Sequence, residues 1–206
     1  MKIEPDPERL RRDWQELSEF RDPNQPGWTR RPFTREYQAA RQWLAERMRA
    51  AGLEIELDPG GNLVGRRLGQ APRAPSMLVG SHMDTVAGGG RFDGIVGVVA
   101  ALEVSRCLRQ RPLRRTLEVV DFLAEEPTDF GISTVGSRAM AGALTSEMLM
   151  RQHQGRTLAQ AIAAVGGRPN ELGQARGDIG HYLELHVEQG PVLEGEGLRL
   201  GIVTDI

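Results

Sequence analysis

SMLVGSHMDTVAGGGRFDGIVGVVAALEVSRCLRQRPLRRTLEVVDFL, residues 76–123, is the stretch of sequence that sets the fold class. Its two ends, residues 76–80 and 117–123, are short continuous apolar runs, which are typical of strands buried on both faces. Residues 94–110 between them form a longer apolar segment that predicts a helix. A strand, a helix and a second strand in this order indicate an α/β domain with a mostly parallel central sheet.

The flanking sequence extends the same pattern in both directions. Before the central stretch, the spacing predicts helices over residues 8–20 and 34–52, joined by a Pro- and Gly-rich loop at 22–33. Strict alternation at 53–57, the turn sequence DPGGN at 58–62 and the run at 63–67 predict a β-hairpin. After the central stretch, we expect a helix over 146–165 broken near 153–155, a strand over 181–187 and a hairpin-like segment over 192–203.

Length, composition and charge narrow the class of protein. With 206 residues and 39% hydrophobic content, the chain is long enough for one domain with a proper core. A formal charge of −2 predicts no strong affinity for nucleic acid or anionic lipid. Cys107 is the only cysteine, which excludes an internal disulfide. The charged N-terminus has no signal-peptide core, and the longest apolar run, 94–102, is too short to span a membrane. We therefore expect a cytoplasmic protein.

Polar side chains cluster directly after the predicted strands. They lie in Ser81-His82-Met83-Asp84, in Glu125-Glu126, in His186-Val-Glu188-Gln189-Gly190, and in the glycine-rich segment that contains Asp93 at the start of the central helix. Each has an ordinary explanation when taken alone: a surface histidine, a solvated pair of glutamates, a helix N-cap. Chemistry in parallel sheets gathers beyond the carboxyl ends of the strands, however, so we expect these groups to converge.

Two imidazoles and several carboxylates at one sheet edge are the ligands that Zn²⁺, Mn²⁺ or Co²⁺ prefer. Asp84 is placed to hold the His82 ring from behind and fix its tautomer. The adjacent glutamates 125 and 126 allow one to bind metal while the other acts as a general base. A carboxylate at Asp93 that bridges two cations needs backbone freedom, which Gly90 and Gly94 provide.

Three blocks of sequence make a family resemblance specific. GSHMDTVAGGGRFDGIVGV (80–98), AEEPTDFGISTVGSRAMAG (124–142) and HVEQGPVLE (186–194) resemble the N-carbamoyl-L-amino-acid hydrolase and allantoate amidohydrolase family, which is related to the di-zinc aminoacylases and carboxypeptidases. The segment at 41–67 is similar to that family as well. The resemblance implies a three-layer, zinc-peptidase-like catalytic domain and hydrolysis of linear amide bonds in small carbamoyl or ureido compounds.

The resemblance also implies a role for each matching residue. Glu125 would be the general base, Gln189 would contact the substrate, and Asp84 would support the site from behind the ligands. For Glu188 a structural hydrogen bond is the competing interpretation, and for residues 136–138 backbone positioning competes with a purely structural part. The metal ligands would be His82 and His186 at one cation, Glu126 at the other, and Asp93 bridging both.

The resemblance ends where the family inserts a smaller dimerisation domain. Residues 1–206 would then be the N-terminal part of the catalytic domain, without that domain and without a final histidine for the second metal. His153 and His181 lie outside the motifs and are expected to be a helix-surface and a strand-start residue. We expect two cations in the family but one weak or absent here, and a free sheet edge that favours self-association or a complementary chain. The alternatives are an aminoacylase- or dipeptidase-like enzyme and an inactive metal-binding or subunit-interaction fragment.

Overall fold

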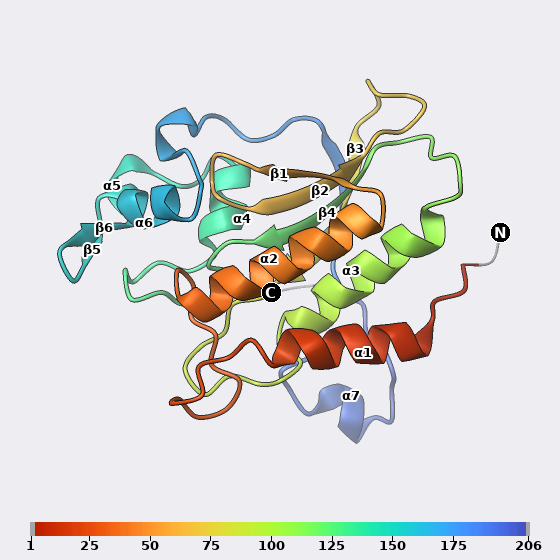
Figure 1. Ribbon diagram of the computed structural model, residues 1–206, viewed down its shortest axis with the longest axis horizontal. Coiled ribbons are helices and arrows are strands. Elements are labelled where there is room, and N and C mark those ends of the chain that lie inside the picture. Colours follow the sequence, from red (N-terminus) through yellow and green to blue (C-terminus); the bar gives the residue numbers. More distant parts are fainter. Residues whose placement is uncertain (1–2, 205–206) are drawn as a thin grey trace.

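A computed structural model describes residues 3–204 as a central sheet with helices packed on it (Figure 1). Within these residues, five strands form the main sheet in the order β1-β2-β4-β3-β7. Only β2 runs against the others, because it is antiparallel to both β1 and β4, while β3 is parallel to β4 and β7. The predicted α/β class with a mostly parallel sheet is therefore confirmed. The strands are β1 (Glu54–Leu57), β2 (Leu63–Arg67), β3 (Ser76–His82), β4 (Leu117–Phe122) and β7 (Ile179–Leu183).

Three helices lie together over one face of the sheet, as Figure 1 shows for α1, α2 and α3. They are α1 (Pro7–Ser18), α2 (Arg35–Ala50) and α3 (Ile95–Leu108). Local sequence explains where they begin: the Asp6 carboxylate accepts the backbone N–H groups of Glu8 and Arg9, and the Thr34 hydroxyl accepts that of Tyr37. The main apolar core lies between these helices and the sheet. All three helices agree with the sequence prediction, as does the β1–β2 hairpin.

The opposite face carries a smaller apolar cluster. Val64, Leu78, Val120 and Phe122 point to this side and are buried there with Met140, at the end of helix α4 (Val135–Met140). The two clusters alternate along β4, so that its odd-numbered positions face the helices and its even-numbered ones face away. Both faces of β4 are therefore buried, as its continuous apolar run predicts.

The segment after α4 differs from the prediction in detail. Instead of one broken helix over 146–165, α5 (Ser146–Leu149) and α6 (Leu158–Ala164) flank a two-stranded ladder of β5 (Gln152–His153) and β6 (Arg156–Thr157). The break falls where it was predicted, since Gln154 and Gly155 both have positive φ. A short 3-10 helix, η1 (Pro169–Glu171), follows.

The C-terminal predictions fit less well. Strand β7 covers Ile179–Leu183 rather than 181–187, so that the residues around His186 follow the strand instead of ending it. The hairpin predicted over 192–203 is wrong, because α7 (Val192–Gly195) begins there and no strand follows it up to residue 204. The cause is Glu188, whose carboxylate accepts the backbone N–H groups of Val192 and Leu193 and thereby starts a helix. None of the helices in the described range has the length and apolarity needed to cross a bilayer.

Candidate metal centre

The carboxyl ends of three parallel strands bring the predicted ligands together. β3 ends at His82, the turn after β4 carries Glu125 and Glu126, and the segment after β7 carries His186. Asp93 lies in the loop that leads into α3. Among the described residues, two groups of three side chains place one ligand atom each within 4.8 Å of the others: His82 with Asp93 and His186, and His82 with Glu125 and Glu126.

The two histidine rings face each other across the centre. His82 Nε2 and His186 Nε2 lie 3.3 Å apart. One carboxylate oxygen of Asp93 lies 3.3 Å from His186 Nε2 and 4.0 Å from His82 Nε2. A carboxylate oxygen of Glu125 is 3.7 Å from His82 Nε2. Four polar atoms from three strand ends and one loop therefore lie close together.

The hydrogen bonds on the far side of each ring determine which nitrogen is available. His82 Nδ1 lies 2.9 Å from the backbone oxygen of Asp84, and His186 Nδ1 lies 2.7 Å from that of Val187. Because a carbonyl oxygen only accepts, each Nδ1 must carry the proton. In the neutral rings, both Nε2 atoms then present lone pairs toward Asp93. This is the arrangement by which backbone carbonyls orient metal-binding histidines, so the donor set fits a divalent cation.

Glycine is required at the entrance to α3. Gly94 has φ +65°, and a Cβ there would lie 2.4 Å from the His82 backbone oxygen and 2.6 Å from His82 Nε2. No other residue type fits between the Asp93 carboxylate and the first histidine without displacing it. The predicted need for backbone freedom at Gly94 is confirmed. At Gly90 no contact is tight, since the nearest atom to such a Cβ is 3.9 Å away.

The acidic groups repel one another in this partly buried place. Burial raises the pKa of Glu125, and the nearby Glu184 and Asp93 carboxylates raise it further. Burial and then the Asp93 carboxylate likewise raise the pKa of Glu126. Three carboxyl groups lie around two imidazoles here, and a bound metal ion would compensate the negative charge that these acids carry when ionised.

Gln189 contacts the centre directly. Its side-chain nitrogen donates to both oxygens of Asp93 at 3.1 Å each, and its backbone has φ +56°. The residue beside it, Glu188, makes the hydrogen bonds at α7 described above, which agrees with its structural interpretation. Neither His153 nor His181 belongs to a ligand group of the described residues. His153 lies in β5 against the Phe130 ring rather than on a helix surface, because the chain turns back at Gln154 and Gly155.

The segment 133–138 supports the turn that carries the glutamates. Backbone N–H groups of Thr134, Val135 and Gly136 donate to the carbonyls of residues 125, 124 and 123. Arg138 donates to the Ser133 carbonyl and the Thr134 hydroxyl, away from the ligands. Within 136–138, only the Gly136 N–H contributes directly to the backbone of this turn, while Ser137 and Arg138 bond within their own segment.

Sequence reasoning missed two side chains that support the centre. Arg30 is almost fully buried, and its guanidinium donates to the carbonyls of Met83, Leu17 and Phe20. Glu184 accepts the hydroxyls of Ser81 and Tyr182, both at 2.5 Å, and so joins the ends of β3 and β7. Glu184 lies two residues before His186 on an extended segment, a spacing that could have indicated that both side chains point to the same side of the chain. Nothing in the sequence around Arg30 indicates its partners.

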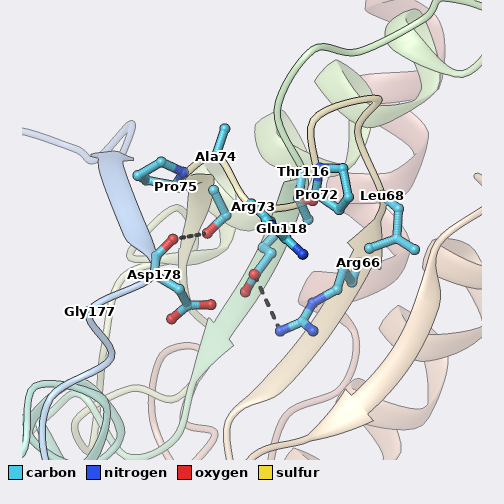
Figure 2. Close-up of a pocket in the computed structure, with 11 residues that line it drawn as sticks. Arg66, Leu68, Pro72, Arg73, Ala74, Pro75, Thr116, Glu118, Gly177 and Asp178 are labelled. Carbon is cyan, nitrogen blue, oxygen red and sulfur yellow. Dashed lines mark hydrogen bonds and ion pairs between the residues drawn. The ribbon is translucent and has the colours of Figure 1, made fainter.

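A cavity of about 470 Å³ lies at the other end of the sheet (Figure 2). It is lined by residues at the starts of β3 and β4, including Ser76 and Thr116, together with Asp178. Its central polar contact is the ion pair between Arg66 and Glu118, at 3.3 Å. None of its lining residues belongs to either ligand group, so this cavity is separate from the candidate metal centre.

The fold and this set of ligands together define a class of metal-dependent hydrolases. The sequence model of peptidase family M20/M25/M40 matches residues 78–203, and the chain belongs to this family. Members of the family are metal-dependent, and His82, Asp93 and His186 are candidate ligands here.

Individual relatives share much more than the metal centre. The chain is 44% identical to an N-carbamoyl-L-amino acid amidohydrolase of Geobacillus stearothermophilus, over 97% of this chain and 50% of that protein. It is 36% identical to a ureidoglycolate hydrolase of Arabidopsis thaliana, over 93% of this chain and 43% of that protein. A hydantoinase/carbamoylase family amidase of Burkholderia ambifaria has a crystal structure that matches with TM-score 0.84 and 37% identity, over 95% of this chain and 48% of that one. The chain thus spans about half the length of these relatives.

Proposed function

We propose that this chain carries the metal-binding part of a hydrolase that cleaves linear C–N bonds in ureido compounds, with N-carbamoyl-L-amino acids as the first substrate class. The observation that carries the proposal is the convergence of two Nε2 lone pairs and the Asp93 carboxylate within 4.8 Å. Both imidazoles have their Nδ1 atoms bound to backbone carbonyls, which is the orientation that metal ligation needs.

Within this proposal, the protein side chains divide into ligands and a proton carrier. His82, Asp93 and His186 would hold one cation, and Asp93 with Glu126 would face a second. Zn²⁺, Mn²⁺ or Co²⁺ held there would supply a Lewis acid that polarises a carbonyl group and acidifies water. Glu125 accepts a proton from the attacking water and passes it to the leaving nitrogen. Burial raises the pKa of Glu125, which makes its carboxylate a stronger base for the first of these proton transfers.

The two cation positions have unequal ligand sets. One has two imidazoles and a carboxylate, whereas the other has the carboxylates of Asp93 and Glu126, with His82 and Glu125 close to it. We propose that the first position binds firmly and the second weakly, because fewer neutral nitrogen ligands serve it.

The substrate class rests on the relatives. The Geobacillus protein is named for N-carbamoyl-L-amino acids and the Arabidopsis protein for ureidoglycolate, and both are matched over nearly all of this chain. For a carbamoyl substrate, one water adds to the ureido carbon, and the products are the free amine, ammonia and carbon dioxide. Allantoate is the related alternative, and a dipeptide or an acylated amino acid is the alternative outside the ureido class.

We also propose that the edge of strand β7 is covered in the active protein, either by a second copy or by a chain that supplies the other half of the fold. β7 stands last in the sheet order, and Leu183, Leu185 and Leu200 expose more than two fifths of their surface along and after it. Apolar strand edges of this kind favour association with another chain. Sedimentation of the purified chain at increasing concentration measures its self-association, and a monomer at every concentration contradicts the second-copy alternative.

The test combines metal binding and hydrolysis. Calorimetric titration of Zn²⁺ into metal-free protein is expected to show one tight and one weak site, and two equally tight sites would contradict the unequal ligand sets. Ammonia release from N-carbamoyl-L-amino acids is then compared with Glu125→Gln, which is expected to lower the rate by about 10²–10⁴-fold. The control is Glu147→Gln, at an exposed glutamate on α5. Equal rates for the wild type and Glu125→Gln would contradict the role of Glu125 as the general base. Cleavage of dipeptides but not of N-carbamoyl-L-amino acids would contradict the proposed substrate class.

A further inference from the structure

We infer that Asp84 is a positioning residue whose carboxylate holds the turn that carries Glu125 and Glu126. This role differs from the contact with His82 expected from the sequence, and it rests on the proposed metal centre for its functional consequence. The two oxygens of the Asp84 side chain accept the backbone N–H groups of Glu125 and Glu126, one each, at 3.0 Å. The side chain is completely buried.

The N–H groups of Glu125 and Glu126 need side-chain acceptors because the neighbouring strand no longer supplies backbone carbonyls there. The ladder between β3 and β4 ends with the pair of His82 and Phe122. Beyond it the chain bends sharply, and Ala124 adopts φ +51°, which is unfavourable for a residue with a Cβ. A buried backbone N–H without a partner is strongly disfavoured. Two adjacent N–H groups pointing the same way require two acceptor atoms close together, which a carboxylate provides.

The other side of the same turn is held by the main chain. The carbonyls of residues 123, 124 and 125 accept backbone N–H groups from residues 136, 135 and 134. With the N–H groups of Glu125 and Glu126 bound to Asp84, the turn is fixed from both sides. The side chains of the two glutamates are then free to face the centre.

The carboxylate of Asp84 does not make the hydrogen bond to His82. The His82 Nδ1 atom lies 2.9 Å from the Asp84 backbone oxygen but 3.8 Å from the nearer side-chain oxygen. Arg30 separately fixes this stretch of backbone, because its guanidinium donates to the Met83 carbonyl at 2.7 Å. A change confined to the Asp84 side chain should therefore leave the His82 ring in place and release the glutamates.

Asp84→Asn is the smallest change that removes the paired acceptors. Asparagine keeps one acceptor oxygen and turns an NH₂ group toward the second N–H, where two donors then oppose each other. Hydrogen exchange of the metal-free protein, resolved by NMR, is the first measurement. We expect exchange at the amides of Glu125 or Glu126 to speed up about tenfold or more, with the β4 interior amides of Val119 and Val120 unchanged. Asp129→Asn, at an exposed aspartate in the following loop, is the matched control.

Unchanged exchange at both glutamate amides in folded Asp84→Asn protein overturns the inference. If that variant fails to fold, the inference is tested by NMR on the wild-type protein. We expect scalar couplings through the hydrogen bonds, from the amide nitrogens of Glu125 and Glu126 to the Asp84 side-chain carbon. The absence of these couplings overturns the inference. Neither measurement needs metal or substrate, so the outcome is independent of whether the proposed function is correct.

Metal binding tests the functional consequence by a double-mutant cycle. Asp84→Asn is expected to weaken Zn²⁺ binding at the weaker position, which includes Glu126, by about 10–100-fold, the range for groups that support metal ligands, and to leave binding at the firm position unchanged. If Asp84 acts through Glu126, the same change in a Glu126→Gln background should alter the affinity by less than about twofold, because the partner is already lost. An equal effect in both backgrounds shows that Asp84 acts elsewhere and overturns the positioning role. An absence of zinc binding in the wild type overturns the proposed function, while hydrogen exchange still decides the role of Asp84.

Discussion

Asn62 joins three separate parts of the fold, and replacing it with alanine should destabilise the protein by an amount that the structure allows us to estimate. Its side-chain nitrogen donates to the Asp58 carboxylate at 2.7 Å and to the Gly136 carbonyl at 3.0 Å, while its oxygen accepts the Leu123 N–H at 2.9 Å. The residue is completely buried. Asn62→Ala would leave the buried Leu123 N–H unpaired and would remove a hydrogen bond from the Asp58 carboxylate, whereas the Gly136 carbonyl lies in α4 and keeps its helical partner.

The expected loss follows from the Leu123 N–H and the Asp58 carboxylate. An unpaired buried N–H costs about 1–3 kcal/mol and a hydrogen bond to a charged group contributes about 1.5–3 kcal/mol, so the substitution should reduce the free energy of unfolding by about 3 kcal/mol. That is a large share of the roughly 5–15 kcal/mol that stabilises a typical domain. In a chain of this size the melting temperature should fall by about 6–12 °C. Leu123 also precedes the glutamate turn, so the loss should loosen the candidate metal centre.

Urea denaturation, followed by circular dichroism, measures this loss. The control is Asn24→Ala, at an exposed loop position, which should change the free energy of unfolding by less than about 0.5 kcal/mol. A second variant, Asn62→Asp, keeps the acceptor for the Leu123 N–H but places a carboxylate against Asp58, and should be at least as destabilising at neutral pH. A loss below about 1 kcal/mol for Asn62→Ala would refute the reasoning, because it would show that other groups satisfy the Leu123 N–H and the Asp58 carboxylate.

Two further changes test other parts of the fold. Gly136→Ala should lower the free energy of unfolding by at least about 2 kcal/mol in the same denaturation assay, because its Cβ would lie 1.9 Å from the Asn62 side-chain oxygen and 2.6 Å from the Leu123 nitrogen. The control is Gly173→Ala, where a Cβ meets no atom within 4 Å, and equal losses for the two variants would contradict the steric argument. Burial by itself raises the pKa of Glu103, but hydrogen bonds from Arg9 and the Asp6 backbone outweigh it and lower that pKa. The stabilisation is therefore complete above the ordinary glutamate pKa of about 4.3 and is lost as the pH falls through the lower folded-state pKa. The difference in stability between the wild type and Glu103→Gln should accordingly shrink below pH 4, and a difference that stays constant from pH 7 to pH 3 would contradict the role of the charge.

The elements that sequence predicted well are those set by local information. Helix α2 begins after Thr34 and ends before Gly52 both in the prediction and in the structure, because capping involves residues only a few positions apart. β3 and β4 are apolar enough to be recognised without knowing their neighbours. The convergence of His82, Asp93, Glu125 and His186 could also be predicted, because parallel strands place their carboxyl ends at one edge whatever the loops do.

Longer-range polar contacts account for the errors. The pattern at 192–203 favours extended chain, yet the Glu188 carboxylate binds the N–H groups of Val192 and Leu193 and begins a helix there. β7 ends at Leu183, and the bonds of Glu184 to Ser81 and Tyr182 take over from the ladder. In both places the hydrogen bonds of one carboxylate, which the apolar pattern does not reveal, determine the local backbone conformation.

The contact of Asp84 shows why such bonds escape sequence reasoning. A carboxylate paired with a histidine or an arginine has a recognisable partner, so its position two residues after His82 suggested the ring. Its actual partners are backbone N–H groups 41 and 42 positions away, which every residue except proline possesses. Sequence can therefore indicate that a polar side chain next to a buried strand must find a partner, while only the fold specifies which main-chain groups lie within reach. For a candidate metal centre built on strand ends, the supporting bonds to the main chain are thus the part least accessible from sequence, and they are the part that mutagenesis at Asp84 and Asn62 would measure.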